Sequence, residues 1–472
     1  MTEDRASPIS ETDLQQFLAA WLTLQDAANL NSTGTSGELA ERVSGHLGVD
    51  PSVLESATAT MLFSDVVNQD LAFDALDPEA EVLGLDPNVG QTGRSVSLQS
   101  LLASQPFVPN QIMPITWVEH PVDVGTTRSC AAAAVRLMKY DGQPVVVGTW
   151  ARQQHGPPGS DDFYLEVLAA DIDLAKRLLS TFAELRREHN VYRGKVLGFS
   201  FTEYGQFGLE FLAMPAVSSE QLILPERDVA AIERHTIGLS TRANELREAG
   251  RHLKRGLLLY GPPGTGKTHT VSYLIGAMPG RTTIILQGPS AGAIGQAAAI
   301  ARSFPPATIV IEDVDLIAYD RGMGPFGENP MMFQLLNEMD GFADDSDLLF
   351  ILTTNRADVL EPALAARPGR IDQAIEVAKP DQDARVRLLK LYLDGIEHVV
   401  TDFDAAAVAL DGVTASFVKE LSRRALMNAL DDEAPLDDEL ILRTITELLE
   451  HGAPVVHRSL GLSPDPTEPD FG

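Results

Sequence analysis

The 472-residue sequence has few of several residue types, and each shortage narrows the possible classes of protein. Cysteine occurs once, as Cys130, which excludes an internal disulfide and a multi-cysteine metal site and is typical of a reducing cytosol. No apolar run reaches the roughly 18 residues of a membrane-spanning helix. Residues 1–5 are acidic and lead into no signal-peptide-like apolar stretch. We therefore expect a cytoplasmic protein without a membrane span.

Basic residues are scarce relative to acidic ones. The 36 Lys and Arg face 67 Asp and Glu, a formal net charge of −31, which repels nucleic acid and anionic membranes on average. We attribute this charge to solubility and expect no nucleic-acid partner. The His-Glu-x-x-His pattern is absent, and His189, His398 and His451 stand singly, which argues against a fused zinc metalloprotease.

The remaining composition, 44% apolar and 6% aromatic, is that of a globular chain with room for two to four domains. Helical spacing dominates residues 1–105, including the apolar positions of 53–62, and predicts a mostly helical region. Residues 106–222 read as an α+β domain that binds a partner or substrate. From 223 to 380, strand and helix patterns alternate, as in a parallel α/β sheet. Helical patterns follow at 381–455, and we expect 456–472 to be disordered.

The most informative motif follows the apolar run 256–260. Its residues are Gly261, Pro262, Pro263, Gly264, Thr265, Gly266, Lys267 and Thr268. Glycines between a strand and a helix allow a tight turn whose main-chain N–H groups and helix dipole bind phosphate. Lys267 can then reach the β- and γ-phosphates, and the Thr268 hydroxyl can hold Mg²⁺. The plain alternative is a glycine-rich turn. His269, next in the chain, either packs as a helix residue or contacts the nucleotide.

Two further apolar runs end in polar residues. The run 307–311 ends in Glu312 and Asp313, and the run 348–354 ends in Asn355. Carboxylates at the carboxyl end of a parallel strand emerge beside a phosphate loop, where one can hold Mg²⁺ and the other can orient the attacking water. An amide at the neighbouring tip can hold that water. Solvated strand-end turns are the alternative for both.

Several motifs occur along the chain in the same order as in the AAA ATPases, which the sequence resembles. They lie at residues 256–268, 312–315, 334–342, 355 and 367–370, and the stretch 339–370 is similar to the second region of homology of that family. The resemblance covers about 225–450. It implies a P-loop NTPase sheet flanked by helices, a small all-α lid, Mg²⁺-dependent ATP hydrolysis, and a homo-oligomeric ring, usually a hexamer, with ATP between subunits. The client protein bound by residues 1–220 stays unidentified.

The resemblance also implies individual roles. It places Glu312 at the metal and Asp313 as the base that activates water. The family usually has Asp-Glu at these two positions. Because Asp313 is one methylene shorter than glutamate, either hydrolysis is slow or an adjusted backbone compensates for the shorter side chain. Arg367 and Arg370 would reach the γ-phosphate of the next subunit as arginine fingers; a surface turn paired to Asp372 or Glu376 is the alternative.

Three further expectations concern the adenine and the pore. Ile237 and Gly238 would contact the adenine from one side, and the small residues Ala415 and Ser416 would lie near it on the lid. The central-pore segment of protein-threading members corresponds to residues 290–296. Ala293 replaces their aromatic residue there, which leaves Ile294 as the apolar grip and weakens a threading function. The leading hypothesis is a protein-remodelling, chaperone-like ATPase; the alternatives are an ATP-gated scaffold with slow hydrolysis and a nucleic-acid motor or loader.

Overall fold

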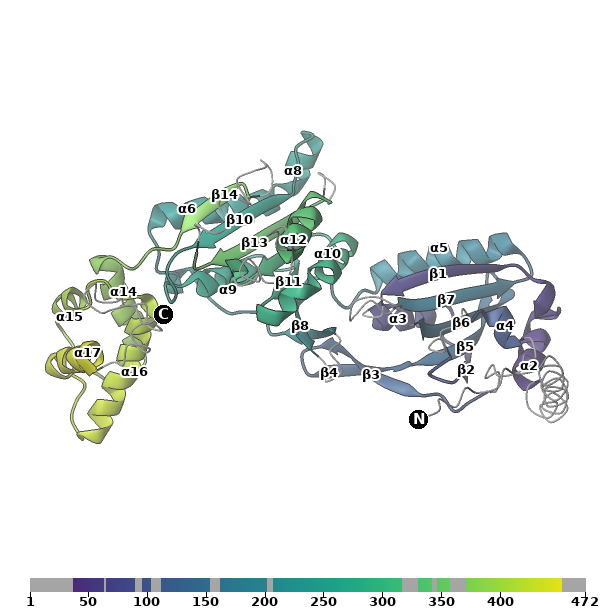
Figure 1. The fold of residues 1–472 in the computed structure, drawn as a ribbon, viewed down its shortest axis with the longest axis horizontal. Helices are drawn as coiled ribbons and strands as arrows, with labels where there is room; N and C mark the ends of the chain where they lie inside the picture. Colours follow the sequence, from purple (N-terminus) through teal and green to yellow (C-terminus); the bar gives the residue numbers. More distant parts are fainter. Residues whose placement is uncertain are drawn as a thin grey trace, which may run out of the picture. The chain divides into compact units, whose positions relative to one another are not determined.

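The computed structural model describes residues 37–62, 65–89, 96–102, 112–152, 162–201, 207–315, 330–341, 346–356 and 371–451. The chain forms two compact units, one of residues 1–191 and 202–208, the other of 192–201 and 209–472 (Figure 1). Every helix among the described residues is too short or too polar to cross a membrane.

The first unit is built on a five-stranded antiparallel sheet in the order β1-β7-β6-β5-β2. Helices α3 and α5 pack on one face through Phe73, Leu178 and Phe182. Helices α2 and α4 pack against the other face. A separate ribbon, β3-β4, completes the unit. The bounds are α2 Glu38–Leu47, η1 Pro51–Val53, β1 Ser56–Leu62, α3 Val66–Leu76, β2 Glu81–Gly84, α4 Leu98–Leu102, β3 Trp117–Asp123, β4 Thr126–Ala131, β5 Ala133–Tyr140, β6 Gln143–Arg152, β7 Asp162–Ala169 and α5 Ile172–Glu188.

The expectation of a separate, mostly helical region up to residue 105 is wrong for β1 and β2, which pair with β7 and β5. In β1 the buried side chains are Ala57 and Met61. A spacing of four residues places both on one face of a helix and also on one face of a strand, so it does not separate the two. The intervening threonines favour the strand, because β-branched residues fit a pleated surface.

The second unit contains a seven-stranded sheet in the order β14-β10-β13-β12-β11-β8-β9. Strands β14, β10, β13, β12, β11 and β8 are parallel neighbours. The bounds are β8 Val196–Phe201, β9 Phe207–Leu212, η3 Ser219–Gln221, α6 Glu226–Glu233, η4 Arg234–Gly238, α7 Leu239–Thr241, α8 Ala243–Glu248, β10 Arg255–Tyr260, α9 Lys267–Ala277, β11 Thr282–Leu286, η5 Gly288–Ala293, α10 Ile294–Ser303, β12 Ala307–Ile311, α12 Pro330–Asp340, β13 Leu348–Thr354 and β14 Gln373–Glu376. The predicted parallel α/β sheet is confirmed.

Strands β8 and β9 were expected in the α+β domain that ends at 222, yet they extend the sheet of the second unit. The structural boundary therefore lies near residue 191. Apolar content identified both segments as strands, but the pattern of one strand does not say which sheet it joins.

Four helices, α14 Gln382–Leu393, α15 Phe403–Ala409, α16 Ala415–Asp431 and α17 Asp438–His451, follow the sheet. Their apolar faces form a core of their own, including Leu389, Phe417, Leu421 and Ile441. The predicted helical region 381–455 is confirmed for its described part, and we call it the helical lid.

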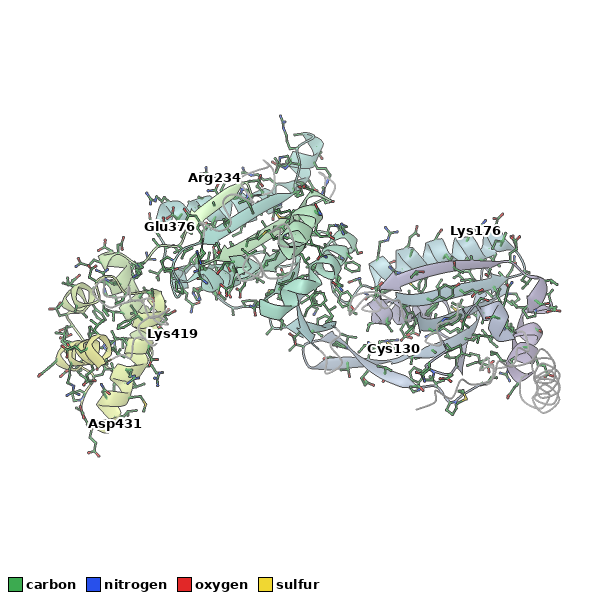
Figure 2. All side chains as sticks on the ribbon, in the orientation of Figure 1. Cys130, Lys176, Arg234, Glu376, Lys419 and Asp431 are labelled. Atoms are coloured by element: carbon green, nitrogen blue, oxygen red, sulfur yellow. The ribbon has the colours of Figure 1, made fainter. Side chains whose placement is uncertain are left out.

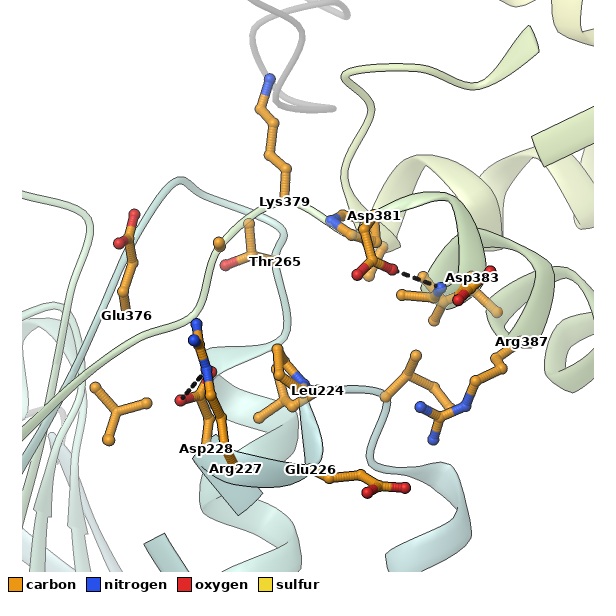
Figure 3. A pocket seen from close by; sticks show the side chains of 18 of the residues that line it. Leu224, Glu226, Arg227, Asp228, Thr265, Glu376, Lys379, Asp381, Asp383 and Arg387 are labelled. Atoms are coloured by element: carbon orange, nitrogen blue, oxygen red, sulfur yellow. Dashed lines mark hydrogen bonds and ion pairs between the residues drawn. The ribbon is translucent and has the colours of Figure 1, made fainter. Parts of the chain in front are cut away.

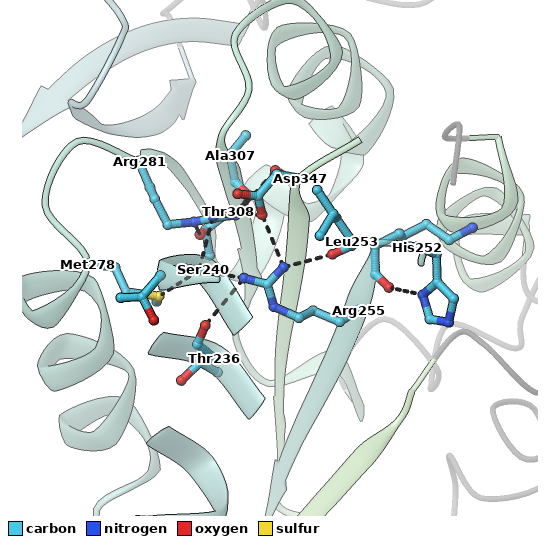
Figure 4. A network of polar contacts seen from close by, with 12 residues as sticks. Thr236, Ser240, His252, Leu253, Arg255, Met278, Arg281, Ala307, Thr308 and Asp347 are labelled. Carbon is cyan, nitrogen blue, oxygen red and sulfur yellow. Dashed lines mark hydrogen bonds and ion pairs between the residues drawn. The ribbon is translucent and has the colours of Figure 1, made fainter. Parts of the chain in front are cut away.

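A buried polar network joins the amino ends of three strands (Figure 4). Asp347 Oδ1 accepts hydrogen bonds from Arg255 Nη1 at 3.0 Å and Arg281 Nη1 at 2.8 Å. Ser240 of α7 accepts from both guanidinium groups at 2.5 and 3.2 Å. The network therefore connects the helices before β10 to the amino ends of these strands. The candidate site lies at the other, carboxyl ends of the strands.

Candidate functional site

The loop between β10 and α9 approaches its neighbours closely at two glycines. A Cβ on Gly261 would lie 2.3 Å from the carbonyl oxygen of Val377, and Gly261 has a φ of 145°. At Gly264, with a φ of 77°, a Cβ would lie 3.1 Å from the Ser416 side chain. Glycine is required at both positions, because other residues lack this backbone freedom. Gly266 ends the loop as the N-cap of α9, so the predicted strand–turn–helix is confirmed.

Lys267, the first residue of α9, is buried beneath this loop. Its Nζ donates to the carbonyl oxygens of Gly261 and Pro262, both at 2.9 Å, and to Asn355 Oδ1 at 2.7 Å. Burial lowers the pKa of Lys267, while the nearby charges of Asp313 and Asp315 oppose this shift. The ammonium is thus held at the loop with acceptors that phosphate oxygens can replace.

Asn355 connects the loop to the acidic strand tip. While its Oδ1 accepts from Lys267, its Nδ2 donates to Asp313 Oδ1 at 3.0 Å. Asp313 has a φ of 49°, the left-handed conformation, and its main-chain N–H donates to Thr353 Oγ1 at 3.0 Å. Strand β13 lies between β10 and β12, so one amide at its tip reaches both neighbours. The structure brings together Lys267, Asp313 and Asn355 as the sequence predicted.

Asp315 fixes the geometry of that tip. The side chain is buried, and its Oδ1 accepts from Thr354 Oγ1 at 2.8 Å and from the Asn355 main-chain N–H at 3.2 Å. A charged acceptor strengthens such hydrogen bonds. Sequence reasoning included Asp315 only in the acidic run and missed this function.

Glu312 forms a second part of the site. Its carboxylate accepts from Gln287 Nε2 at 2.5 Å. Burial raises the pKa of Glu312, and the nearby side chains of Thr268 and Gln287 oppose that shift. The two residues predicted to hold metal, Thr268 and Glu312, are therefore adjacent, whereas Gln287 was not predicted.

Hard oxygen donors of this kind fit Mg²⁺, which usually takes one or two carboxylate ligands and completes its shell with water and phosphate. No group of three His, Cys, Asp or Glu side chains suited to a metal ion occurs in the described part of the chain.

A cavity of about 410 Å³ opens beside the loop (Figure 3). Its wall includes Ile223 and Leu224 before α6, Thr265 of the loop, and Leu388 and Ala415 of the helical lid. The main-chain N–H of Ser416 donates to the Gly264 carbonyl oxygen at 3.0 Å, so the lid contacts the loop directly. Ala415 lines the cavity, and Ser416 contacts the loop, so their proximity to the adenine stays a prediction.

Ile237 and Gly238 are absent from this cavity wall. They end η4, a π-helical turn, and Ile237 packs against the apolar core. The segment 223–228 contributes to the cavity wall instead. An Ile-Gly pair before a strand is too short a signal to fix which of two neighbouring turns faces the cavity.

Other candidates lie apart from the site or outside the described residues. The exposed ring of His269 hydrogen-bonds to the Gln221 carbonyl group at 3.1 Å. Ala293 and Ile294 are 0% and 1% exposed, so neither offers a surface to a client. Arg367 and Arg370 lie outside the described residues.

Comparisons with known proteins agree with this geometry. Residues 257–379 match the family described as "ATPase family associated with various cellular activities (AAA)". The chain is 33% identical over 223 residues to "26S proteasome regulatory subunit 10B" of Dictyostelium discoideum, which covers 42% of this chain and 56% of that protein. It is 33% identical over 242 residues to "Proteasome-activating nucleotidase" of Methanothermobacter thermautotrophicus, 48% of this chain and 58% of the relative.

A third match, 35% identical over 200 residues, is "ATP-dependent zinc metalloprotease FtsH" of Cutibacterium acnes, 39% of this chain and 28% of the relative. The chain therefore spans just over half the length of the first two relatives and less of the third.

Proposed function

Residues 257–379 belong to the AAA family of ATPases, and from this premise we propose that the chain binds ATP with Mg²⁺ and hydrolyses it. The single observation that supports this most strongly is the continuous chain of contacts from Lys267 through Asn355 to Asp313. It joins the glycine-rich loop to an acidic strand tip through one amide side chain.

Main-chain N–H groups of residues 264–268 and the amino end of α9 would bind the β-phosphate. Lys267 would exchange its carbonyl and amide acceptors for β- and γ-phosphate oxygens. The base would enter the cavity between Leu224 and Ala415, where apolar wall groups face the ring. The lid contact at Gly264 would then sense whether the cavity is filled.

Thr268 and Glu312 would hold Mg²⁺, which neutralises phosphate charge when bound. Asn355 holds Oδ1 of Asp313, so Oδ2 would accept the proton of the attacking water. The left-handed backbone of Asp313 changes the direction in which its short side chain extends from the strand. This is the kind of adjustment that can compensate for a missing methylene.

We propose a homo-oligomeric ring, most simply a hexamer, in the cytoplasm, in which Arg367 and Arg370 act on the ATP of the neighbouring subunit. The proteasome-activating nucleotidase to which the chain is similar supports a protein-remodelling function on a client bound through the first unit. The net charge of −31 disfavours the nucleic-acid alternative.

The ATP-gated scaffold remains the second candidate, because two observations favour it. Asp313 is shorter than the usual glutamate, and a small misplacement can lower a rate by about 10²-fold. In addition, Ala293 and Ile294 are buried, which removes the predicted apolar grip on a threaded polypeptide.

Steady-state phosphate release by purified protein tests both candidates. A remodelling ATPase should turn over well above background, respond to unfolded polypeptide, and lose turnover in Asp313→Asn while still binding ATP. A rate near background that no polypeptide changes would instead support the scaffold. Filter binding to DNA and RNA at low salt should be negative; tight binding would favour the motor or loader.

The arginines are tested by mixing subunits. Rings that combine Arg367→Ala or Arg370→Ala subunits with Lys267→Ala subunits contain some interfaces with both an intact loop and an intact arginine. Such mixtures should exceed the activity of either variant alone. If native mass confirms co-assembly and activity does not rise, the arginines do not act between subunits.

A further inference from the structure

Gln287 contacts Glu312 from the neighbouring strand tip. It directly follows β11, and the Glu312 main-chain N–H donates to the Leu286 carbonyl oxygen at 3.0 Å, which extends the pairing of β11 and β12 by one residue. From this position Gln287 Nε2 donates to Glu312 Oε2 at 2.5 Å. The proposed ATP site therefore contains an amide that the motif at 312–313 does not predict.

The main chain of Gln287 is also fixed. Gln287 precedes the turn η5, and its main-chain carbonyl oxygen accepts from the Ser290 main-chain N–H at 3.1 Å. Ser290 Oγ also contacts the main-chain N–H and carbonyl groups of Gln287 at 2.8 and 2.9 Å. These contacts hold the backbone from which the Gln287 side chain extends to Glu312.

The turn itself is anchored in the core. Ser290, Ala291, Ala293 and Ile294 are all buried, and η5 contacts β8, β11 and α10. The same burial that removes Ala293 and Ile294 from the surface thus gives Gln287 a rigid support. Residues 288–294 serve as an internal brace for the strand tip.

We propose that Gln287 is a positioning residue that holds the carboxylate of Glu312 for Mg²⁺, an inference that rests on the proposed function. Glutamate has one more rotatable bond than the aspartate usual at this place, so its carboxylate samples more positions. By binding Oε2, Gln287 fixes the plane of the carboxylate and leaves Oε1 for the metal beside Thr268. The extra methylene at residue 312 and the glutamine at 287 then form a matched pair.

The simpler view is that this hydrogen bond only joins two strand tips. The two views differ in what happens when the glutamate is shortened. If Gln287 positions the carboxylate, replacing Gln287 should have no effect on Mg²⁺ binding in Glu312→Asp, because Gln287 Nε2 no longer reaches the shorter side chain. A contribution to folding alone would weaken the site equally in both backgrounds.

The experiment is a double-mutant cycle on the full chain. The readout is the Mg²⁺ concentration that gives half-maximal binding of a fluorescent ATP analogue, which needs no hydrolysis. The variants are Gln287→Ala, Glu312→Asp and the double variant, with Gln382→Ala, an exposed glutamine on the helical lid, as matched control. Binding in EDTA and circular dichroism check the loop and the fold.

We expect Gln287→Ala to raise this Mg²⁺ concentration about tenfold, the usual size for residues that orient a ligand. In the Glu312→Asp background the same change should alter it by less than about twofold, and Gln382→Ala should have no effect. Gln287→Asn, which keeps the amide but shortens it, should resemble Gln287→Ala. This conservative variant decides the matter should the alanine variant fold poorly.

An unchanged Mg²⁺ requirement in Gln287→Ala, or the same fold-change in both backgrounds, would overturn the inference. If the unmodified chain shows no Mg²⁺-dependent nucleotide binding at all, the proposed function fails instead, and the two failures are distinguished.

Discussion

Replacing Asp347 by asparagine should destabilise the second unit while leaving the first unit intact. Asp347, 8% exposed, is the carboxylate between Arg255 and Arg281, which are 3% and 4% exposed. Burial lowers the pKa of Arg255, as does the charge of Arg281, and the Asp347 carboxylate opposes both effects. Asparagine keeps the shape and one acceptor oxygen but removes the negative charge that contacts both guanidinium groups.

The magnitude follows from the burial of the three groups. Removing one partner of a buried ion pair typically costs about 3–5 kcal/mol, because the remaining charge is uncompensated. The retained carbonyl oxygen places our expectation near the lower end, at about 3 kcal/mol. For a unit of this size, roughly 2–4 °C of melting temperature corresponds to each kcal/mol, so we expect a decrease of about 6–12 °C.

The positions of the tryptophans allow unfolding of the first unit to be followed separately. All three tryptophans, Trp21, Trp117 and Trp150, precede residue 191, so tryptophan fluorescence follows only the first unit. Far-UV circular dichroism follows both. We expect Asp347→Asn to lower the melting transition seen by circular dichroism and to leave the fluorescence transition unchanged. Asp431→Asn, at an exposed position on the helical lid (Figure 2), is the matched control and should change neither.

A melting temperature of Asp347→Asn equal to that of Asp431→Asn would refute this reasoning, because it would mean that the two guanidinium groups need no buried counter-charge. A parallel decrease in both signals would show instead that the units unfold together.

Three further predictions concern single positions. Gly264→Ala should weaken binding of a fluorescent ATP analogue at least about tenfold, since alanine resists a φ of 77° and would press on Ser416; unchanged affinity would count against the close loop geometry. Asn355→Ala should lower the turnover number about 10²-fold with affinity nearly unchanged, and loss of affinity alone would contradict its assigned position. Cys130, whose pKa burial raises to about 12, should resist iodoacetamide at pH 8 until denaturant is added, and rapid alkylation of folded protein would show that the thiol is exposed.

The elements that carry the site were predictable because their signals are local and strong. A glycine-rich loop between an apolar run and a helix has few alternative structures. Lys267 begins α9, and Asp313 and Asn355 lie within two residues of the ends of β12 and β13. Parallel pairing then brings the strand ends to one edge of the sheet without further information. The helical lid was predictable from its apolar spacing for the same reason.

The remainder depends on contacts that a linear pattern does not contain. The spacing of Ala57 and Met61 fits two periodicities, and only pairing with β7 selects the strand. Gln287 and Asp315 act through hydrogen bonds across strands, so their functions follow from register and not from residue type. Ile237 lies in a π-helical turn outside the cavity wall, and a linear pattern does not reveal such a turn.

The central claim is that the loop 261–268 binds a nucleoside triphosphate through Lys267. Calorimetric titration of the full chain with ATP and Mg²⁺, compared with Lys267→Ala, tests it most directly. The account predicts saturable binding by the unmodified chain and none by a folded Lys267→Ala variant. Tight ATP binding that persists without the lysine would contradict it.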